Sequence, residues 1–227
     1  MSNHTNHTLL ADNIQLKFGP RRILSAILIR CETGSITGLL GRNGSGKSCL
    51  LRILYGDQPA IRRSVRFDGV NVVQPFKHKG LVLYLPQYNF IPPSLPLSRV
   101  LDDYQLEFRE MEKRLPELGM AHRSRIRDLS GGHQRLINLY IVIRSPSHFA
   151  LLDEPFTHLM PLQIEKVKEM LLEEKPKKGW LITDHLYTEV TSLSDRLYIL
   201  VDGATHSAKT SQDLLSLGYI PPTGHSV

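Results

Sequence analysis

Eight consecutive residues, Gly41 to Ser48, limit most strongly what this chain can fold into. They read Gly-Arg-Asn-Gly-Ser-Gly-Lys-Ser and match G-x-x-x-x-G-K-[ST], the pattern of a loop that binds phosphate groups. The apolar residues 35–40 before the loop predict a buried strand, and residues 48–55 after it predict a helix that Gly56 can end. A strand before the loop and a helix after it favour a phosphate site over a glycine-rich turn that matches by chance.

Each part of the loop has a way to hold phosphate. Glycines let the backbone close around an anion with its N–H groups pointing inward, and the start of a helix adds partial positive charge. Lys47 can neutralise the β- and γ-phosphates of a nucleotide, and the hydroxyl of Ser48 can bind Mg²⁺. We therefore expect the nucleotide to be bound by Gly41, Arg42, Asn43, Gly44, Ser45, Gly46, Lys47 and Ser48.

The composition predicts a packed globular protein. Of the 227 residues, 41% are hydrophobic and 22% are charged, which suits one large domain or a core with a subdomain. No apolar run approaches the ~20 residues that span a bilayer, and the polar residues 1–8 do not resemble a signal segment. We expect the protein to be cytoplasmic unless a partner tethers it. Two cysteines, Cys31 and Cys49, do not make a disulfide framework.

The net charge of +6 permits contact with nucleic acid or anionic lipid but does not require it. The densest basic cluster, residues 123–127, lacks interleaved aromatic residues, and no nucleic-acid-binding module is visible. We expect no nucleic-acid partner.

Predicted strands and helices alternate along the chain. Strands are predicted at residues 9–17, 23–30, 35–40, 64–67, 70–72, 80–85, 147–152, 179–183 and 196–201. Helices are predicted at residues 48–55, within 97–127 with breaks at Pro116 and Gly119, and at 130–143, 161–174 and 210–217. This alternation predicts a mostly parallel α/β sheet. The early strands and a hairpin turned by Asp68-Gly69 predict an antiparallel portion beside it.

Polar residues follow several predicted strands, at the edge where open α/β sheets bind ligands. They are the phosphate-binding loop, Gln87, the pair Asp153-Glu154, and His185. Asp153 ends an apolar strand, as suits a residue that holds Mg²⁺ directly or through water. Because side chains alternate along an extended chain, Glu154 points elsewhere and can polarise a water molecule against the γ-phosphate.

Two further features can contact a nucleotide. Phe18, at the end of the first predicted strand, can stack on a purine, although an ordinary core phenylalanine fits the spacing equally well. Residues 129–135 read Leu-Ser-Gly-Gly-His-Gln-Arg and open a helix for which Ser130 is placed as N-cap. The two glycines, Gly131 and Gly132, allow close backbone approach, so this helix start is a second candidate anion site.

With these motifs in this order, the chain resembles the nucleotide-binding subunit of an ABC transporter. Its phosphate-binding loop resembles the Walker A motif, residues 129–134 resemble the LSGGQ signature, and residues 149–154 resemble Walker B with its catalytic glutamate. Gln87 is similar to the Q-loop glutamine, His185 to the switch histidine, and Phe18 to the A-loop aromatic residue. The resemblance spans residues 9 to about 205, and a signature just upstream of Walker B is far more specific than Walker A alone.

The resemblance implies a P-loop NTPase fold with a RecA-like core. The core would comprise residues 9–90 and 146–217 and include an antiparallel β subdomain, and a small α-helical subdomain would span about 91–145, between loose termini at 1–8 and 218–227. It also implies a dimer, with itself or with a paralogue, that closes head to tail on two ATP molecules and Mg²⁺. Transmembrane permease subunits would be the partners and would hold the chain at the inner face of the cell membrane. ATP would close the dimer and hydrolysis would open it, which powers transport.

The family pattern gives each candidate residue a role. Ser48, Gln87 and Asp153 would surround Mg²⁺, and the catalytic set would be Glu154, His185, Gln87 and Lys47. Glu154 would orient or deprotonate the attacking water, and His185 would contact the γ-phosphate and hold Glu154. Phe18 would stack on adenine. The other subunit's site would be completed by Ser130, Gly131, Gly132 and His133.

The sequence departs from the family pattern at four positions. Cys49 stands where Thr or Ser is usual and can still donate weakly to an α-phosphate oxygen, and His133 replaces a Gln or Glu. In residues 156–161, His158 replaces a Gly and Met160 replaces the Asp that helps couple the two sites of the dimer. Because a thioether cannot accept the strong hydrogen bonds of a carboxylate, we expect ATP binding to be kept and hydrolysis to be weakened.

Two other functions fit parts of the sequence. One is a nucleotide-gated dimerisation module with weak or vestigial ATPase activity, which the change at Met160 suggests. The other is a chromosome- or repair-type ATPase, which needs a long coiled-coil insertion between Walker A and the signature. Only 81 residues, 49–129, separate Ser48 from Ser130, without sustained heptads, which disfavours this alternative.

Overall fold

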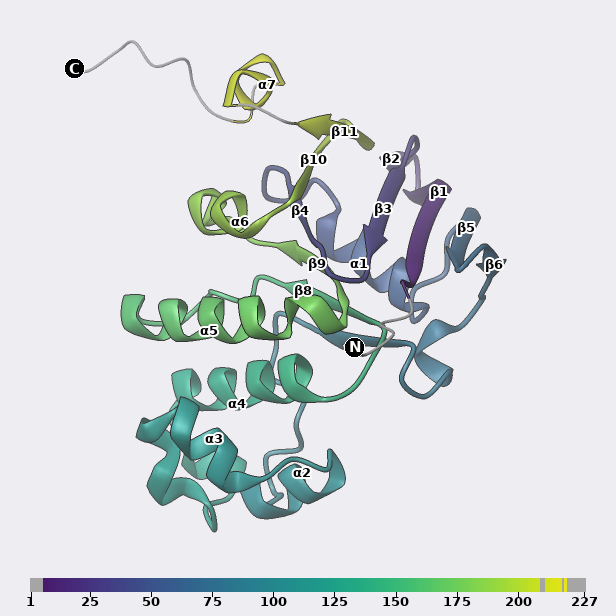
Figure 1. Cartoon of the computed structure of the whole chain (residues 1–227). Helices are drawn as coiled ribbons and strands as arrows, with labels where there is room; N and C mark the ends of the chain where they lie inside the picture. The colour runs from purple at the N-terminus through teal and green to yellow at the C-terminus, as the bar shows by residue number, and fades with distance from the viewer. Residues whose placement is uncertain (1–5, 209–210, 218, 220–227) are drawn as a thin grey trace, which may run out of the picture.

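A six-stranded sheet carries the strand ends at which most candidate residues lie (Figure 1). In the computed structural model, which describes residues 6–208, 211–217 and 219, its strands run in the order β11 (Ala204–Ala208), β10 (Arg196–Val201), β4 (Ile36–Leu40), β9 (Gly179–Thr183), β8 (Phe149–Asp153) and β7 (Val82–Leu85). Neighbours from β10 to β7 are parallel, and only β11 is antiparallel to its neighbour among these six strands. The predicted mostly parallel α/β sheet is confirmed.

The central strands of this sheet are buried on both faces. All five residues of β4, of β8 and of β9 are buried. Alternate side chains of β8 enter two different cores: Phe149 and Leu151 pack around α1 (Lys47–Tyr55), whereas Ala150 and Leu152 pack beneath the helices on the other face. This two-sided burial explains why these strands are continuous apolar runs in the sequence.

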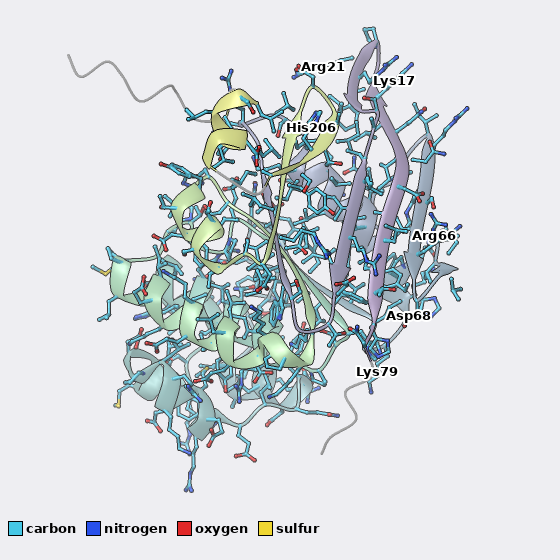
Figure 2. All side chains as sticks on the ribbon, turned by 45° about the horizontal axis from the view of Figure 1, so that its top comes forward. Lys17, Arg21, Arg66, Asp68, Lys79 and His206 are labelled. Carbon is cyan, nitrogen blue, oxygen red and sulfur yellow. The ribbon has the colours of Figure 1, made fainter. Side chains whose placement is uncertain are left out.

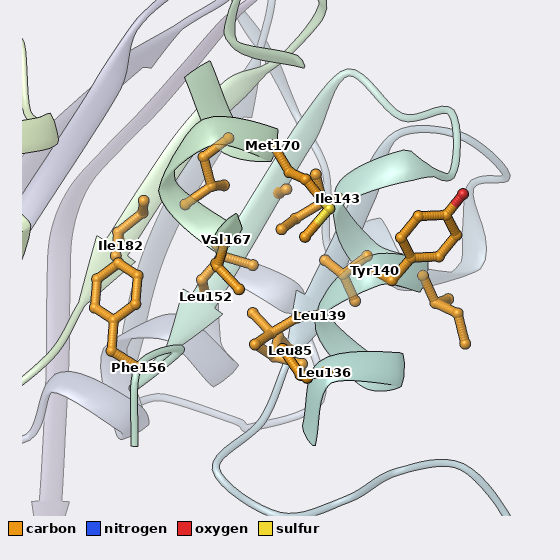
Figure 3. Close-up of a cluster of buried hydrophobic side chains, with 14 of the residues drawn as sticks. Leu85, Leu136, Leu139, Tyr140, Ile143, Leu152, Phe156, Val167, Met170 and Ile182 are labelled. Atoms are coloured by element: carbon orange, nitrogen blue, oxygen red, sulfur yellow. The ribbon is translucent and has the colours of Figure 1, made fainter. Parts of the chain in front are cut away.

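Two long helices cover that second face. Figure 3 shows side chains of α4 (Gly131–Arg144) and α5 (Pro161–Glu174) packed against residues of the sheet. The helices contribute Leu136, Leu139, Tyr140, Ile143, Val167 and Met170, and the strands contribute Leu85, Leu152 and Ile182. Helix α5 has the bounds that the sequence predicts, and Ser130 caps α4, as predicted, by accepting the backbone N–H of His133 at 3.3 Å.

A smaller antiparallel sheet packs on the other side of α1 (Figure 1). Its long strand β1 (Thr8–Phe18) pairs with β2 (Arg21–Leu24), β3 (Leu28–Glu32) and β5 (Arg62–Phe67), and β5 also pairs with β6 (Val70–Asn71). Asp68 and Gly69, which join β5 to β6, have φ angles of 50° and 81°. Two positive φ angles in a two-residue loop are typical of the type I′ hairpin turn. The predicted antiparallel portion and its hairpin are confirmed.

The single strand predicted at 23–30 is wrong, because two strands, β2 and β3, occupy this segment. Between them the backbone N–H groups of Ser25 and Ala26 both donate to the carbonyl of Gly203, at 2.8 and 3.1 Å. The pairing of β1 with β2 also shifts register between Leu16 and Lys17. The chain therefore leaves the antiparallel sheet for three residues to meet the turn between β10 and β11.

The region between β7 and α4 is helical but broken. It contains α2 (Leu97–Asp103), α3 (Phe108–Arg114) and 3₁₀ turns at Pro116–Ala121 and Ile126–Asp128. In Figure 1, α2 and α3 lie on the side of α4 that faces away from the sheets. A separate helical subdomain at about 91–145 remains a prediction.

Apart from short 3₁₀ turns, two elements of the described chain were not predicted. The unpredicted elements are α6 (Tyr187–Leu193) and β11, whereas α7 (Ser211–Ser216) lies inside the helix predicted at 210–217.

Of the N-terminus predicted to be loose, residues 6–8 are described, and Nδ1 of His7 lies 2.7 Å from Oδ2 of Asp68. Of the predicted loose tail 218–227, all but residue 219 lies outside the described residues. In Figure 2, Asp68 lies at one end of the antiparallel sheet, and Lys17 and Arg21 lie at the other end.

Candidate nucleotide-binding site

The phosphate-binding loop joins the end of β4 to the start of α1. Gly44 and Gly46 have φ angles of 75° and 105°, which favour glycine. A Cβ atom at Gly46 would lie 2.8 Å from Cγ2 of Ile23, so space as well as backbone conformation requires glycine there. The Nζ group of Lys47 lies inside the loop and donates to the carbonyl oxygens of Gly41 (2.7 Å) and Arg42 (3.3 Å). Burial lowers the pKa of Lys47, and nearby carboxylates, first among them Glu154, oppose that effect.

Three polar side chains from distant parts of the sequence meet beside the loop. The hydroxyl of Ser48 donates to Oδ1 of Asp153 at 3.1 Å. The amide Nε2 of Gln87 lies 3.1 Å from the same hydroxyl and 3.5 Å from Asp153 Oδ1. They meet because β7 and β8 are neighbouring parallel strands whose carboxyl ends lie at one edge of the sheet, next to α1.

Asp153 is held from its other side by a residue that the sequence analysis did not single out. The hydroxyl of Tyr84, on β7, donates to Asp153 Oδ2 at 3.1 Å. Burial raises the pKa of Asp153, while the hydrogen bonds from Ser48 and Tyr84 lower it. A tyrosine three residues before Gln87 in an otherwise apolar strand is the sequence signal that could have identified this contact.

The residues that meet here have the chemistry that Mg²⁺ prefers. Mg²⁺ takes oxygen ligands, usually one or two carboxylates together with substrate phosphates and water. Ser48, Asp153 and Gln87 present a hydroxyl, a carboxylate and an amide. No group of three or more His, Cys, Asp or Glu side chains within the described part of the chain could hold a metal on its own. A divalent ion at this place would therefore depend on nucleotide phosphates for its remaining ligands.

Glu154 and His185 line the same cavity as residues of the phosphate-binding loop. Nδ1 of His185 is 3.8 Å from Oε2 of Glu154, and the hydroxyl of Thr157 donates to the same oxygen at 3.4 Å. Glu154 has a φ angle of 50°, a left-handed conformation that costs a residue other than glycine about 1–3 kcal/mol. Its backbone N–H donates to the carbonyl of Thr183 at 2.7 Å. The surrounding structure thus imposes an unfavourable conformation on Glu154.

Most of the predicted site residues line one cavity of about 620 Å³. They are Phe18, Asn43, Gly44, Gly46, Lys47, Ser48, Cys49, Gln87, Glu154 and His185. The side chain of Phe18 is 56% exposed, so the alternative that it is an ordinary core residue is wrong. An adjoining cavity of about 590 Å³ shares Asn43 and Gly44 and is lined by Arg42 and Ser45, together with Arg21 and Arg22.

The signature residues lie elsewhere. Ser130, Gly131, Gly132 and His133 line neither of these cavities. They form the first turn of α4, next to the segment that follows Glu154: a Cβ atom at Gly132 would lie 3.6 Å from the carbonyl oxygen of His158. His158 has a φ angle of 64°, so the backbone here has the left-handed conformation that suits the glycine of the family pattern.

The fold and the site together define a nucleotide-binding domain of the ATP-binding cassette type. A family model described as ABC transporter matches residues 24–157, and the chain belongs to this family. It is an ATP-binding subunit that powers transport, and it is an ATPase.

Its sequence relatives match nearly the whole chain. It is 26% identical over 220 residues to the high-affinity branched-chain amino acid transport ATP-binding protein BraG of Pseudomonas aeruginosa, a match that covers 90% of this chain and 94% of that protein. It is 27% identical over 226 residues to the lipopolysaccharide export system ATP-binding protein LptB of Escherichia coli, with 92% of each chain covered.

Solved structures show the same fold. An ATP-binding subunit of an ABC transporter superposes with a TM-score of 0.79 at 22% identity, covering 93% of both chains. A nucleotide-free ATP-binding cassette from an ABC transporter gives 0.75 at 21% identity, covering 95% of this chain and 96% of the other. Over the residues that the structure describes, no helix is both long enough and apolar enough to cross a bilayer.

Proposed function

We propose that the cavity of about 620 Å³ binds ATP and hydrolyses its γ-phosphate bond with the residues that the motifs indicate. The single observation that carries this proposal is the meeting of Ser48, Gln87 and Asp153 within hydrogen-bond distance, on the rim of a loop shaped for phosphate. Lys47 and the loop amides bind the β- and γ-phosphates, and the exposed ring of Phe18 stacks on adenine. Cys49 lines the same cavity, at the position expected for the α-phosphate.

Ser48 and Asp153 would hold Mg²⁺ through their oxygens. Gln87 would be the third protein ligand through its amide oxygen, which requires the amide to turn, because its Nε2 faces Ser48 and Asp153 here. When bound, the ion neutralises charge on the β- and γ-phosphate oxygens. Tyr84 keeps the carboxylate of Asp153 in one orientation by its hydrogen bond to Oδ2, which leaves Oδ1 facing Ser48.

Glu154 is the general base or the water-orienting residue. Its carboxylate lies at the cavity wall, within 3.8 Å of the His185 imidazole and within hydrogen-bond distance of Thr157. His185 holds the carboxylate on one side and reaches the γ-phosphate from a side chain that is half exposed. Glu154 would then orient a water molecule toward the γ-phosphate of bound ATP for attack.

A second subunit completes the site. Ser130 to His133 form the start of a 14-residue helix, which is an anion-binding arrangement. Since they line neither cavity of their own chain, their phosphate belongs to a partner subunit. ATP thus joins two chains, and the dimer opens when the phosphate that both contact is cleaved.

The contact with the membrane partner lies next to Gln87. An apolar groove of about 340 Å³ is formed by Phe90, Ile91, Pro92, Leu95, Val100 and Tyr104, with Asp103 at its edge. Its first residue, Phe90, lies three positions after Gln87 in the chain, so an occupant of the groove would be linked through a short segment to a proposed Mg²⁺ ligand. We assign it to a cytoplasmic segment of a transmembrane permease subunit, and with that partner the chain would lie at the inner face of the membrane.

Two variants separate binding from hydrolysis. Glu154→Gln should keep ATP binding and lower turnover by orders of magnitude, because the amide cannot take a proton from water. Lys47→Ala should weaken ATP binding about 10- to 100-fold, because it removes a charged hydrogen-bond donor to phosphate. Both are checked by steady-state phosphate release and by equilibrium binding of ATP. Undiminished turnover in the Glu154 variant would overturn the assignment.

The second candidate is a nucleotide-gated dimerisation module. It is favoured by one observation: Met160, at the family position of an interface aspartate, is 69% exposed and offers no carboxylate to a partner. Phosphate release measured with and without the permease subunits distinguishes the two functions. A module with vestigial ATPase activity would dimerise on ATP and release phosphate only weakly in both cases.

A further inference from the structure

A buried guanidinium connects three segments of the site, and it belongs to the last residue of the segment 129–135, which has no assigned role so far. Arg135, on α4, is 3% exposed. Its Nη1 donates to the carbonyl oxygen of Pro86 at 2.6 Å, and its Nη2 donates to the carbonyl oxygens of Asp153 (3.0 Å) and Glu154 (2.7 Å). All three acceptors are backbone groups at the carboxyl ends of β7 and β8.

A charge in this position is costly, which points to a specific task. Burial lowers the pKa of Arg135 to about 10, although the nearby carboxylates of Asp153, Asp184 and Glu154 act to raise it. The side chain therefore stays charged at neutral pH. An apolar side chain of similar size would avoid the cost of removing the charge from water. The guanidinium nevertheless directs both terminal nitrogens to two strand ends, and its Nε has no hydrogen-bond partner among the described residues.

What Arg135 holds is the part of the site with the least favourable backbone. Glu154 has a φ angle of 50°, and its carbonyl accepts the 2.7 Å hydrogen bond from Nη2. On the other strand, Pro86 directly precedes Gln87. One rigid, planar group therefore fixes the peptide that carries the carboxylate of Glu154 relative to the peptide that carries the amide of Gln87.

We propose that Arg135 is a positioning residue for hydrolysis, which aims Glu154 at the γ-phosphate and ties that aim to the signature helix. The inference rests on the proposed role of Glu154. Arg135 lies five residues after Ser130 on the same helix, so a displacement of the helix start by the partner's phosphate moves the guanidinium as well. Arg135 then transmits closure of the dimer to the catalytic carboxylate without touching nucleotide.

The first test separates kcat from ATP binding. In Arg135→Met, kcat should fall about 10²-fold, the scale of a misplaced catalytic group, while the Kd for ATP changes by less than about twofold. The kcat of Arg135→Lys should lie between that of Arg135→Met and that of the wild type. An ammonium group can reach some of the three carbonyls, but it cannot reach all of them in one plane.

The matched control is Arg144→Met. Arg144 is on the same helix and its side chain is 23% exposed, but it pairs with Glu174 at 2.6 Å, far along the helix from the site. It should keep the wild-type kcat. All variants are compared with the wild type for thermal midpoint, so that a loss of folding is recognised.

The second test is chemical rescue. Arg135→Ala leaves space beside the three carbonyls, and added guanidinium ion, below the concentration that lowers the thermal midpoint, should restore part of kcat. The same addition should restore nothing in Glu154→Gln or in the wild type. Rescue of kcat is not expected of a side chain that only stabilises the fold.

The outcomes are distinct. Wild-type kcat in folded Arg135→Met, or in Arg135→Lys if the Met variant does not fold, would overturn the inference. So would parallel losses of kcat and ATP affinity without rescue by guanidinium. If Glu154→Gln itself keeps its turnover, the proposed function fails first. If only the Arg135 variants behave as wild type, this inference alone fails.

Discussion

The hydroxyl of Ser48 donates a 3.1 Å hydrogen bond to Oδ1 of Asp153, although the two residues are 105 positions apart in the chain. Ser48 lies in the first turn of α1 and Asp153 ends β8, and α1 packs directly against β8. The amide of Gln87 reaches the same hydroxyl. The phosphate-binding loop, the acidic strand end and the segment after β7 are therefore joined through a single side-chain oxygen.

This geometry predicts that Ser48→Ala weakens ATP binding only when Mg²⁺ is present. The variant loses an oxygen ligand, while Lys47 and the loop amides remain, so binding with Mg²⁺ should weaken by about tenfold or more, the scale of a hydrogen bond to a charged group. Titration of ATP with Mg²⁺ and with a chelator measures both values. Ser192→Ala, on the distant helix α6, is the control. An equal loss in both conditions would show that the hydroxyl acts on phosphate rather than on the ion.

Much of the fold could be predicted because its strands are buried on both faces. Continuous apolar runs such as 149–153 and 179–183 end at polar residues, and that contrast fixes both the strands and the site edge. The two elements that were not predicted, β11 and α6, lack such a continuous apolar run. Strand β11 reads Ala-Thr-His-Ser-Ala and forms through its pairing with β10 and its hydrogen bonds with the segment 26–28. Helix α6 buries only Val190 and Leu193 of its seven residues. Their existence depends on neighbours distant in the sequence.

The same reasoning explains which site residues could be found. Residue type and spacing alone identify the motifs that contain Lys47, Ser48, Asp153 and Glu154. Knowledge of the fold is not needed for these residues. Arg135 could not be recognised, because its partners are backbone carbonyls of Pro86, Asp153 and Glu154, which have no side-chain signature. A charged residue directly before the uncharged run 136–143 was the only sequence signal of its burial.

Met160→Asp should raise the ATPase rate and also stabilise α5. Met160 is the N-cap of α5, where Asp is among the preferred residues and Met is not, so the helix should gain about 1 kcal/mol. Met160→Asn provides a similar cap without the charge and is the control. Phosphate release and thermal unfolding are measured for both. If neither variant hydrolyses ATP faster than the wild type, the change at position 160 does not limit turnover.

Gly38→Ala should destabilise the protein although the substitution adds one methyl group. A Cβ atom at Gly38 would lie 2.4 Å from Ser194 Oγ, 2.7 Å from Leu197 Cδ1 and 2.8 Å from Val190 Cγ1. Strand β4 is held between β9 and β10 and cannot move aside, so we expect a loss of about 1–3 kcal/mol in the free energy of unfolding. Gly119→Ala is the control, because its Cβ would closely approach only the Oε1 atom of Glu112, the end of a flexible side chain. This substitution should lower the free energy of unfolding by less than about 0.5 kcal/mol. Equal losses, measured by urea unfolding, would contradict the packing argument.

Lys178 lies buried at the end of α4, far from the strand ends that carry the site. It is 2% exposed, and its Nζ donates to the carbonyl oxygens of Val142 (3.2 Å), Ile143 (2.5 Å) and Ser145 (2.6 Å). Burial lowers the pKa of Lys178 from 10.5 to about 7. The amine is therefore largely neutral in the folded protein at mildly alkaline pH, where the unfolded chain still carries its charge.

This difference makes stability depend on pH in a known direction. Between the folded pKa of about 7 and the unfolded value of 10.5, the unfolded state binds a proton that the folded state does not, so the free energy of unfolding rises with pH. The stabilisation is complete above the unfolded pKa and is lost as pH falls toward 7. Lys178→Met removes the amine that binds this proton. Between pH 7 and pH 9, the free energy of unfolding of the wild type should therefore rise by about 1–2 kcal/mol relative to that of the variant. Urea unfolding of both proteins at the two pH values measures the change, and a difference that stays constant would mean that Lys178 remains charged in the folded state.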